Sequence, residues 1–230
     1  MIDEGQFNEN LRIVRESIAK ACEKCGRQTH EVKLLPVTKN WPVVAVEYCR
    51  NAGMKTVGEN RVQEACEKQQ GIGGIDWELI GHLQGNKVNQ VVGNFSRIQT
   101  VDSLKLLRRI AVVSDRMNLK CRVLLQVNTG KDPAKFGFSE REAVDALGEA
   151  LQLPSLLVEG LMTIAPYVPD NLSVARASFE KLATLRDSLQ LQYGVLLPEL
   201  SMGMSGDLFE AIEAGSTMIR VGSALWGNRS

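Results

Sequence analysis

The chain has 230 residues, of which 44% are hydrophobic and 23% are charged, a balance typical of a globular protein with a sizeable core. Lysine plus arginine and aspartate plus glutamate number 27 each, so the overall charge gives no reason to bind nucleic acid or an anionic membrane. Any anion site must therefore be local, and the length is one at which single α/β barrels are found.

Five cysteines, an odd number, are scattered along the chain without a secretory signal or an apolar run of membrane-spanning length. We therefore expect a reduced, cytoplasmic protein. Cys22 and Cys25 form a single C-x-x-C at the end of an amphipathic helical pattern, and no second pair completes a zinc site. We interpret both as helix residues and expect no metal site.

From residue 3 to residue 25, apolar side chains recur at spacings of three and four before Gly26, which predicts a long amphipathic helix. Beyond it, short apolar runs typical of buried strands alternate with helical stretches. The eight predicted strands cover residues 33–37, 55–57, 77–80, 97–101, 123–127, 156–161, 199–202 and 217–221. The predicted helices between them cover residues 43–51, 61–69, 86–92, 103–118, 140–151, 173–190 and 207–213.

This regular alternation favours a closed (β/α)8 TIM-type barrel, preceded by an extra N-terminal helix, over an open doubly wound sheet. No linker, low-complexity segment or internal repeat interrupts the pattern. We therefore expect residues 1–230 to form a single domain.

In such a barrel the active site forms at the carboxyl ends of the strands, so the residues that follow each strand matter most. Lys39 follows the first strand. Partial desolvation lowers the pKa of a lysine, and a neutral amine can condense with an aldehyde to form an imine. Most lysines are solvated surface charges, so Lys39 taken alone is a weak signal.

Two further polar residues follow the next strands: Asn60 after the second and His82 after the third. His82 can contact a bound ring, and it is equally suited to a helix cap or a core contact. Residues 81–87, G-H-L-Q-G-N-K, lack the glycine spacing and the serine or threonine of a nucleotide phosphate loop. Residues 131–137 fit a lid over the barrel mouth and an exposed charged loop equally well.

The last two strand exits contain residue types that suit an anion. Ser205 lies in a small-residue turn that opens a helix, and Arg220, Gly222 and Ser223 accompany the end of the eighth strand. Loops after strands seven and eight commonly hold phosphate in barrels of this kind. Two ordinary turns are the alternative, and the pattern alone does not decide between them.

An imine-forming lysine opposite a phosphate site fits a phosphorylated aldehyde. Pyridoxal 5′-phosphate (PLP) is one such molecule, and the sugar phosphates of Schiff-base aldolases are others. An aldolase would be colourless as purified, whereas a PLP protein would be yellow.

The sequence resembles the pyridoxal phosphate homeostasis proteins, a family related to the barrel domain of alanine racemase. The motifs that carry the resemblance span nearly the whole chain: P-V-T-K at 36–39, V-G-E-N-R-V-Q-E at 57–64, W-E-L-I-G-H-L-Q-G-N-K at 77–87, E-G-L-M-T-I-A at 159–165, L-S-M-G-M-S-G-D at 200–207 and T-M-I-R-V-G-S-A-L-W-G at 217–227.

The resemblance implies a set of cofactor-binding residues and no catalytic residue. They are Lys39 as the aldimine lysine, Asn60 and His82 near the ring, Met202 beneath it, Ser205 with the backbone of Gly222 and Ser223 at the phosphate, and Arg220 at the pyridine nitrogen. Trp226 departs from the family pattern, in which we expect Phe in many relatives.

The resemblance further implies a role in PLP homeostasis, as a carrier or regulator of cofactor supply that affects amino-acid and keto-acid balance, with no established catalytic reaction. An arginine at the pyridine nitrogen keeps that nitrogen unprotonated and weakens the ring as an electron sink. A weak PLP-dependent amino-acid racemase is the alternative. Racemases of the related group take a second base from a carboxy-terminal domain, and we expect that base to be missing because the chain ends at Ser230.

The expected partners are PLP itself and PLP-requiring apoenzymes, with no nucleic acid and no membrane. We expect a monomer or a weak dimer.

Overall fold

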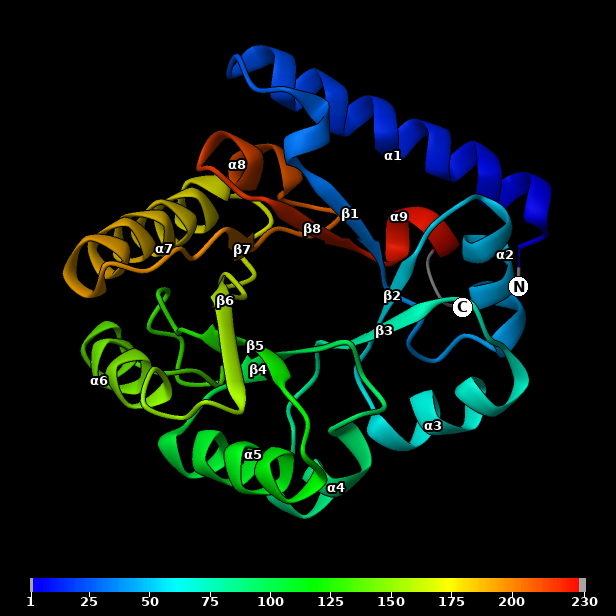
Figure 1. The fold of residues 1–230 in the computed structure, drawn as a ribbon. Helices are drawn as coiled ribbons and strands as arrows, with labels where there is room; N and C mark the ends of the chain where they lie inside the picture. Colours follow the sequence, from blue (N-terminus) through cyan, green and yellow to red (C-terminus); the bar gives the residue numbers. More distant parts are fainter. Residues whose placement is uncertain (1, 228–230) are drawn as a thin grey trace.

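The computed structural model describes residues 2–227, in which eight parallel strands form a barrel (Figure 1). The strands are β1 (Lys33–Pro36), β2 (Thr56–Glu59), β3 (Asp76–Leu79), β4 (Arg97–Val101), β5 (Cys121–Gln126), β6 (Leu156–Met162), β7 (Glu199–Ser201) and β8 (Met218–Val221). Their order in the sheet is β1-β8-β7-β6-β5-β4-β3-β2. A parallel bridge between Val37 and Gly58 joins the two ends of the sheet, which confirms the TIM-type barrel.

Helices surround this barrel (Figure 1). They are α1 (Glu4–Lys24), α2 (Val43–Asn51), α3 (Val62–Gly71), α4 (Val88–Val91), α5 (Leu104–Met117), α6 (Glu140–Ala150), α7 (Leu172–Tyr193), α8 (Leu208–Glu213) and α9 (Ser223–Trp226), with short 3-10 helices η1 (Thr29–Glu31) and η2 (Gly85–Lys87). The helix predicted over residues 86–92 is divided into η2 and α4, and η1 is too short to leave a periodic pattern. None of the helices within residues 2–227 combines the length and apolar character that a bilayer crossing requires.

The extra N-terminal helix α1 lies on the outside of the barrel, against α8 and α9 (Figure 1). Asp3 caps its first turn by accepting a hydrogen bond from the Gln6 backbone N–H at 2.8 Å. Phe7 on its buried face stacks on Trp226 of α9, with 4.7 Å between ring centroids. This contact ties the start of the chain to the segment that follows β8.

A hydrogen-bonded chain of polar side chains runs through the interior of the barrel. Arg220 donates to the Ser201 hydroxyl at 2.7 Å, and Ser201 donates to Gln99 Oε1 at 2.6 Å. The Gln99 amide donates to Glu78 at 2.6 Å, and both Glu78 oxygens accept from Arg97 at 2.9 Å. The chain of bonds therefore links Arg220, near the strand exits, to Arg97 at the start of β4.

Candidate functional site

A cavity of about 520 Å³ is lined by residues that follow the carboxyl ends of the strands. Six of the eight cofactor-binding residues predicted from the sequence line it: Lys39, Asn60, Ser205, Arg220, Gly222 and Ser223. These residues come from the exits of β1, β2, β7 and β8, so the barrel brings together side chains that are up to 184 positions apart. The volume is in the usual range for a small-molecule or cofactor site.

The backbone before Lys39 is anchored by a buried ion pair. The Thr38 hydroxyl donates to Glu59 Oε1 at 2.7 Å, and the Lys68 ammonium donates to the Thr38 carbonyl at 2.8 Å. Lys68 also binds Glu59 at 2.5 Å. Burial raises the pKa of the Glu59 carboxyl, while the hydrogen bonds from Lys68 and Thr38 oppose that rise. The charged side chains of Glu59 and Lys68 therefore hold the backbone at the end of β1.

The backbone after Lys39 is held by the same group of side chains. Asn40 has a left-handed backbone with φ of 58°, and its N–H donates to Glu64 Oε1. Glu64 also accepts from Lys68 at 2.8 Å. The half-buried Lys39 thus projects into the cavity from a turn that is fixed on both sides.

Arg220 is a buried cation in the cavity wall. Burial lowers the pKa of Arg220 to about 10, with the charge of Asp207 opposing the shift, so the guanidinium stays protonated at neutral pH. It donates to the Ser201 hydroxyl at 2.7 Å and to the Thr163 carbonyl at 2.9 Å. These two bonds fix the direction in which the charge points.

The loops after β7 and β8 are joined to each other. The Ser205 hydroxyl accepts a hydrogen bond from the Ala224 backbone N–H at 3.3 Å. Gly203 has φ of +94°, and a Cβ there would lie 2.4 Å from the Ala211 Cβ, so the first loop requires glycine at this position. Asp207 Oδ1 accepts from the Met204 N–H at 2.6 Å and closes the turn.

The structure places the other two predicted residues outside this lining. His82 Nδ1 lies 2.8 Å from Asp102 Oδ2, and the imidazole stacks on Phe136 with 4.0 Å between centroids. His82 instead lines a separate groove. Met202 is fully buried, and Met204, two positions later, lines the cavity in its place.

Several apolar and aromatic lining residues carry no clear signal in the sequence. They are Val37, Trp41, Ile80, Ile164, Tyr167 and Met204. Trp41 is two positions from Lys39, and Ile80 is two positions from His82. This closeness to predicted site residues could have suggested both. Tyr167 lies in an irregular loop after β6 and had no periodic pattern to reveal it.

The C-x-x-C pair lies at the end of α1, where Cys25 donates from its thiol to the Ala21 carbonyl at 3.2 Å. All five cysteines are free thiols. Within residues 2–227, no group of three or more His, Cys, Asp and Glu side chains is arranged to hold a metal ion.

Comparison with known proteins places these residues in a family context. Residues 2–230 match the family model described as the alanine racemase N-terminal domain. A protein of Aquifex aeolicus (strain VF5) named pyridoxal phosphate homeostasis protein is 41% identical over 223 residues, which cover 96% of this chain and 97% of that protein. The chain belongs to the pyridoxal phosphate homeostasis protein family.

Solved structures of related proteins have the same fold. PipY of Synechococcus elongatus PCC7942, solved with PLP bound, aligns with a TM-score of 0.80 and 34% identity over 91% of this chain and all of that chain. Alanine racemase of Clostridium difficile 630 aligns with a TM-score of 0.79 and 17% identity over 96% of this chain and 57% of that chain. At that identity the racemase shows a shared fold only.

Proposed function

We propose that this member of the pyridoxal phosphate homeostasis family binds PLP in the 520 Å³ cavity, with Lys39 as the covalent tether, and acts as a carrier or regulator of cofactor supply. One observation carries the proposal. Lys39, the charged Arg220 and the joined loops at Ser205 and Ala224 belong to a single site, in a chain whose close relatives bear the name pyridoxal phosphate homeostasis protein.

The side chains present match the functional groups of PLP. The amine of Lys39 suits the aldehyde, with which it would form an imine by loss of water. The Ser205 hydroxyl and the backbone at Gly222 and Ser223 suit the phosphate. Arg220 suits the pyridine nitrogen, because a cation that stays protonated keeps a neighbouring nitrogen unprotonated. When bound, the cofactor supplies an electron-withdrawing ring, which this arginine weakens as an electron sink.

The lining of the cavity favours a carrier over an enzyme. No carboxylate or imidazole is among the side chains within residues 2–227 that line it. His82 is hydrogen-bonded to Asp102 and stacks on Phe136, and it lines the separate groove instead. A racemase needs a second acid–base group, and the phenol of Tyr167 is the lining side chain that could serve as one.

Reduction with borohydride followed by peptide mass mapping tests the site of attachment. We expect the cofactor mass on the peptide that contains Lys39 and a yellow protein before reduction. Lys39→Ala should lose both signals, whereas Lys55→Ala, which removes an exposed lysine outside the cavity, should keep them. An unmodified Lys39 peptide from a yellow protein would overturn the assignment.

Hydrogen exchange in heavy water separates the carrier from the weak racemase. A carrier should leave the α-hydrogen of alanine or serine in place during incubation with the loaded protein. Exchange that disappears in Lys39→Ala and falls in Tyr167→Phe would establish racemase chemistry instead.

The same proposal covers the organisation and setting of the protein. We infer that residues 1–230 act as one PLP-binding domain, that the protein is cytoplasmic, and that it is a monomer or weak dimer. PLP-requiring apoenzymes are the proposed recipients. The time course of cofactor transfer from the loaded protein to a purified apoenzyme measures this role directly.

A further inference from the structure

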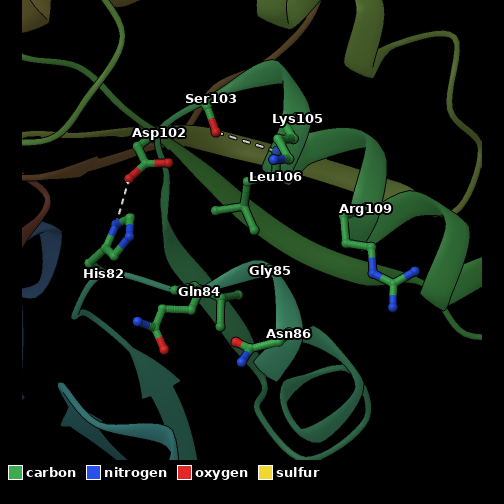
Figure 2. A pocket seen from close by; sticks show the side chains of 10 residues that line it. His82, Gln84, Gly85, Asn86, Asp102, Ser103, Lys105, Leu106 and Arg109 are labelled. Atoms are coloured by element: carbon green, nitrogen blue, oxygen red, sulfur yellow. Dashed lines mark hydrogen bonds and ion pairs between the residues drawn. The ribbon is translucent and has the colours of Figure 1, made fainter.

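A second cavity, of about 710 Å³, lies beside the exits of β3 and β4 (Figure 2). One wall is formed by residues 82–86 and the other by the first turns of α5. Leu83 and Leu106 are buried and form an apolar floor. We call this cavity the rim groove.

The two walls of the rim groove carry polar side chains with unused bonding capacity. Lys105 and Arg109 lie four positions apart on α5, one turn from each other on the same face. Gln84 and Asn86 lie on the facing wall (Figure 2). Among residues 2–227, none of these four side chains makes a hydrogen bond or an ion pair.

The charge of the rim groove is positive. Asp102 is its one carboxylate among the described lining residues, and that carboxylate is occupied by His82 at 2.8 Å. Lys105 and Arg109 outnumber this carboxylate two to one, so the lining has an excess of positive charge within a chain whose overall charge is zero. An occupant that complements this surface carries negative charge.

The exposure of these cations indicates the kind of occupant. Lys105, Arg109, Gln84 and Asn86 are all exposed, and a single exposed ion pair is worth little, so a small anion would be held weakly. A macromolecular segment gains from several such contacts at once. Its amide groups can bond Gln84 and Asn86, and an apolar side chain can cover the leucine floor.

The lining favours a protein segment over a nucleic acid. Single-stranded nucleic acids bind through stacking on aromatic faces together with a basic groove. Among the described residues that line this groove, His82 is the one with an aromatic side chain, and one face of its imidazole is already stacked on Phe136. Two cations alone give a weak electrostatic attraction for a phosphate backbone.

The rim groove adjoins the mouth of the barrel. Ile80 lines the 520 Å³ cavity and His82 lines the groove, two positions further along the same chain segment. A protein docked in the groove would therefore lie next to the opening that leads to Lys39.

We propose that the rim groove is the docking site for an acidic protein segment with an apolar side chain, carried by an apoenzyme that receives the cofactor. This inference rests on the proposed carrier function. The matched surfaces are the cations Lys105 and Arg109, the amides Gln84 and Asn86, and the floor of Leu83 and Leu106.

Binding of a fluorescein-labelled peptide, Glu-Glu-Leu-Asp-Glu, measured by anisotropy at low salt, tests the groove without any cofactor. The double variant Lys105→Gln/Arg109→Gln should bind about tenfold more weakly than the parent chain. The control Lys20→Gln/Lys181→Gln removes two exposed lysines from α1 and α7 and changes the net charge equally, so it should bind as the parent does.

Three results would overturn the docking site. One is equal peptide affinity in parent and groove variant, and another is an equal loss in the control variant. The third is tighter binding of a single-stranded RNA oligonucleotide than of the peptide, with a loss of that binding in the groove variant. That result would make nucleic acid the occupant of the groove.

Transfer of PLP from the loaded protein to an acidic apo-aminotransferase tests the role of docking. The groove variant should load the same amount of cofactor with the same absorbance, yet transfer it about tenfold more slowly at low salt, with the difference disappearing at high salt. Failure of every form to load PLP would overturn the carrier function itself. Normal loading with equal transfer rates in parent, groove variant and control would overturn only the docking site.

Discussion

Lys68 is a buried lysine whose charge is used to hold the turn that carries Lys39. Its ammonium binds Glu59 at 2.5 Å, Glu64 at 2.8 Å and the Thr38 carbonyl at 2.8 Å. Replacing it with methionine keeps much of the volume but leaves Glu59 buried without a counter-charge. We expect Lys68→Met to lower the free energy of unfolding by about 3–5 kcal/mol, as measured by urea denaturation.

The double variant Lys68→Met/Glu59→Leu is the matched control, because it removes both charges together. It should recover a large part of the lost stability, since an apolar pair of similar volume often replaces a buried ion pair without loss. A single variant as stable as the parent would show that the pair does not support the β1 exit.

Asp207, in the loop after β7, makes a pH-dependent contribution to the free energy of unfolding. Burial raises its pKa above the usual 3.8, although the Met204 N–H and the charge of Arg220 oppose the shift. As the pH rises from 3.8 toward the folded-state pKa, the unfolded chain loses its proton first, so stability falls. Asp207→Asn keeps an acceptor for Met204 and does not titrate.

The difference in melting temperature between Asp207→Asn and the parent should therefore shift in favour of the variant as the pH rises from about 4. Thermal unfolding across that range measures it. A shift in the opposite direction would mean that Arg220 outweighs burial at this carboxyl.

At the scale of elements, Trp226 of α9 contacts both the N-terminal helix and the barrel. The indole of Trp226 donates to the Val37 carbonyl at 2.8 Å, and its ring stacks on Phe7 of α1. Phenylalanine, which we expect in many relatives, can keep the stacking and cannot donate the hydrogen bond. The carbonyl at the end of β1 would then remain buried without that donor.

We expect Trp226→Phe to lower the free energy of unfolding by about 1–3 kcal/mol. For a chain of this size, that corresponds to a fall in melting temperature of several degrees. Trp226→Leu removes both the donor and the aromatic stacking, so it should cost more. Equal melting temperatures for the parent and Trp226→Phe would show that water replaces the indole at Val37.

At the scale of the whole molecule, the barrel could be predicted because its determinants are local. Apolar runs and helical periods lie within short windows, and parallel closure then brings Lys39, Ser205 and Arg220 to one end regardless of their distance in the chain. Thus six residues predicted at strand exits line one cavity.

The remaining details depend on contacts that periodicity does not encode. The direction of His82 depends on Asp102 and Phe136, which come from other loops. Met202 and Met204 are two positions apart in a turn, and only the backbone path decides which one lines the cavity. The rim groove likewise depends on the approach of residues 82–86 to α5.

The ion cluster inside the amino-terminal end of the barrel is a second feature that the sequence did not reveal. Arg97 binds Glu78 through two hydrogen bonds of 2.9 Å and Glu159 at 3.0 Å, and Glu199 lies 3.5 Å away. Burial opposes its charge, yet Glu78 and the other carboxylates raise the pKa of Arg97 overall. Lys33 also pairs with Glu199.

Arg97→Met should therefore destabilise the fold, because Glu78 would lose its cation within the barrel while Glu159 keeps Arg122 at 2.7 Å. We expect the free energy of unfolding to fall by about 3–5 kcal/mol at pH 7. The loss should shrink as the pH falls, since protonation of Glu78 removes a buried unpaired charge from the folded variant, whereas in the unfolded chain the same carboxylate is solvated and gains nothing from it. Urea denaturation at pH 7 and pH 4.5 measures this dependence.

Arg97→Lys separates charge from geometry in the same experiment. Lysine restores a positive charge but cannot donate from a planar fork to both Glu78 oxygens, so it should recover only part of the stability. Hydrogen bonds link Glu78 through Gln99 and Ser201 to Arg220. Loss of the Arg97 side chain should therefore also weaken the hydrogen bonds that hold Arg220. A destabilisation by Arg97→Met that does not change with pH would indicate lost packing rather than an unpaired carboxylate.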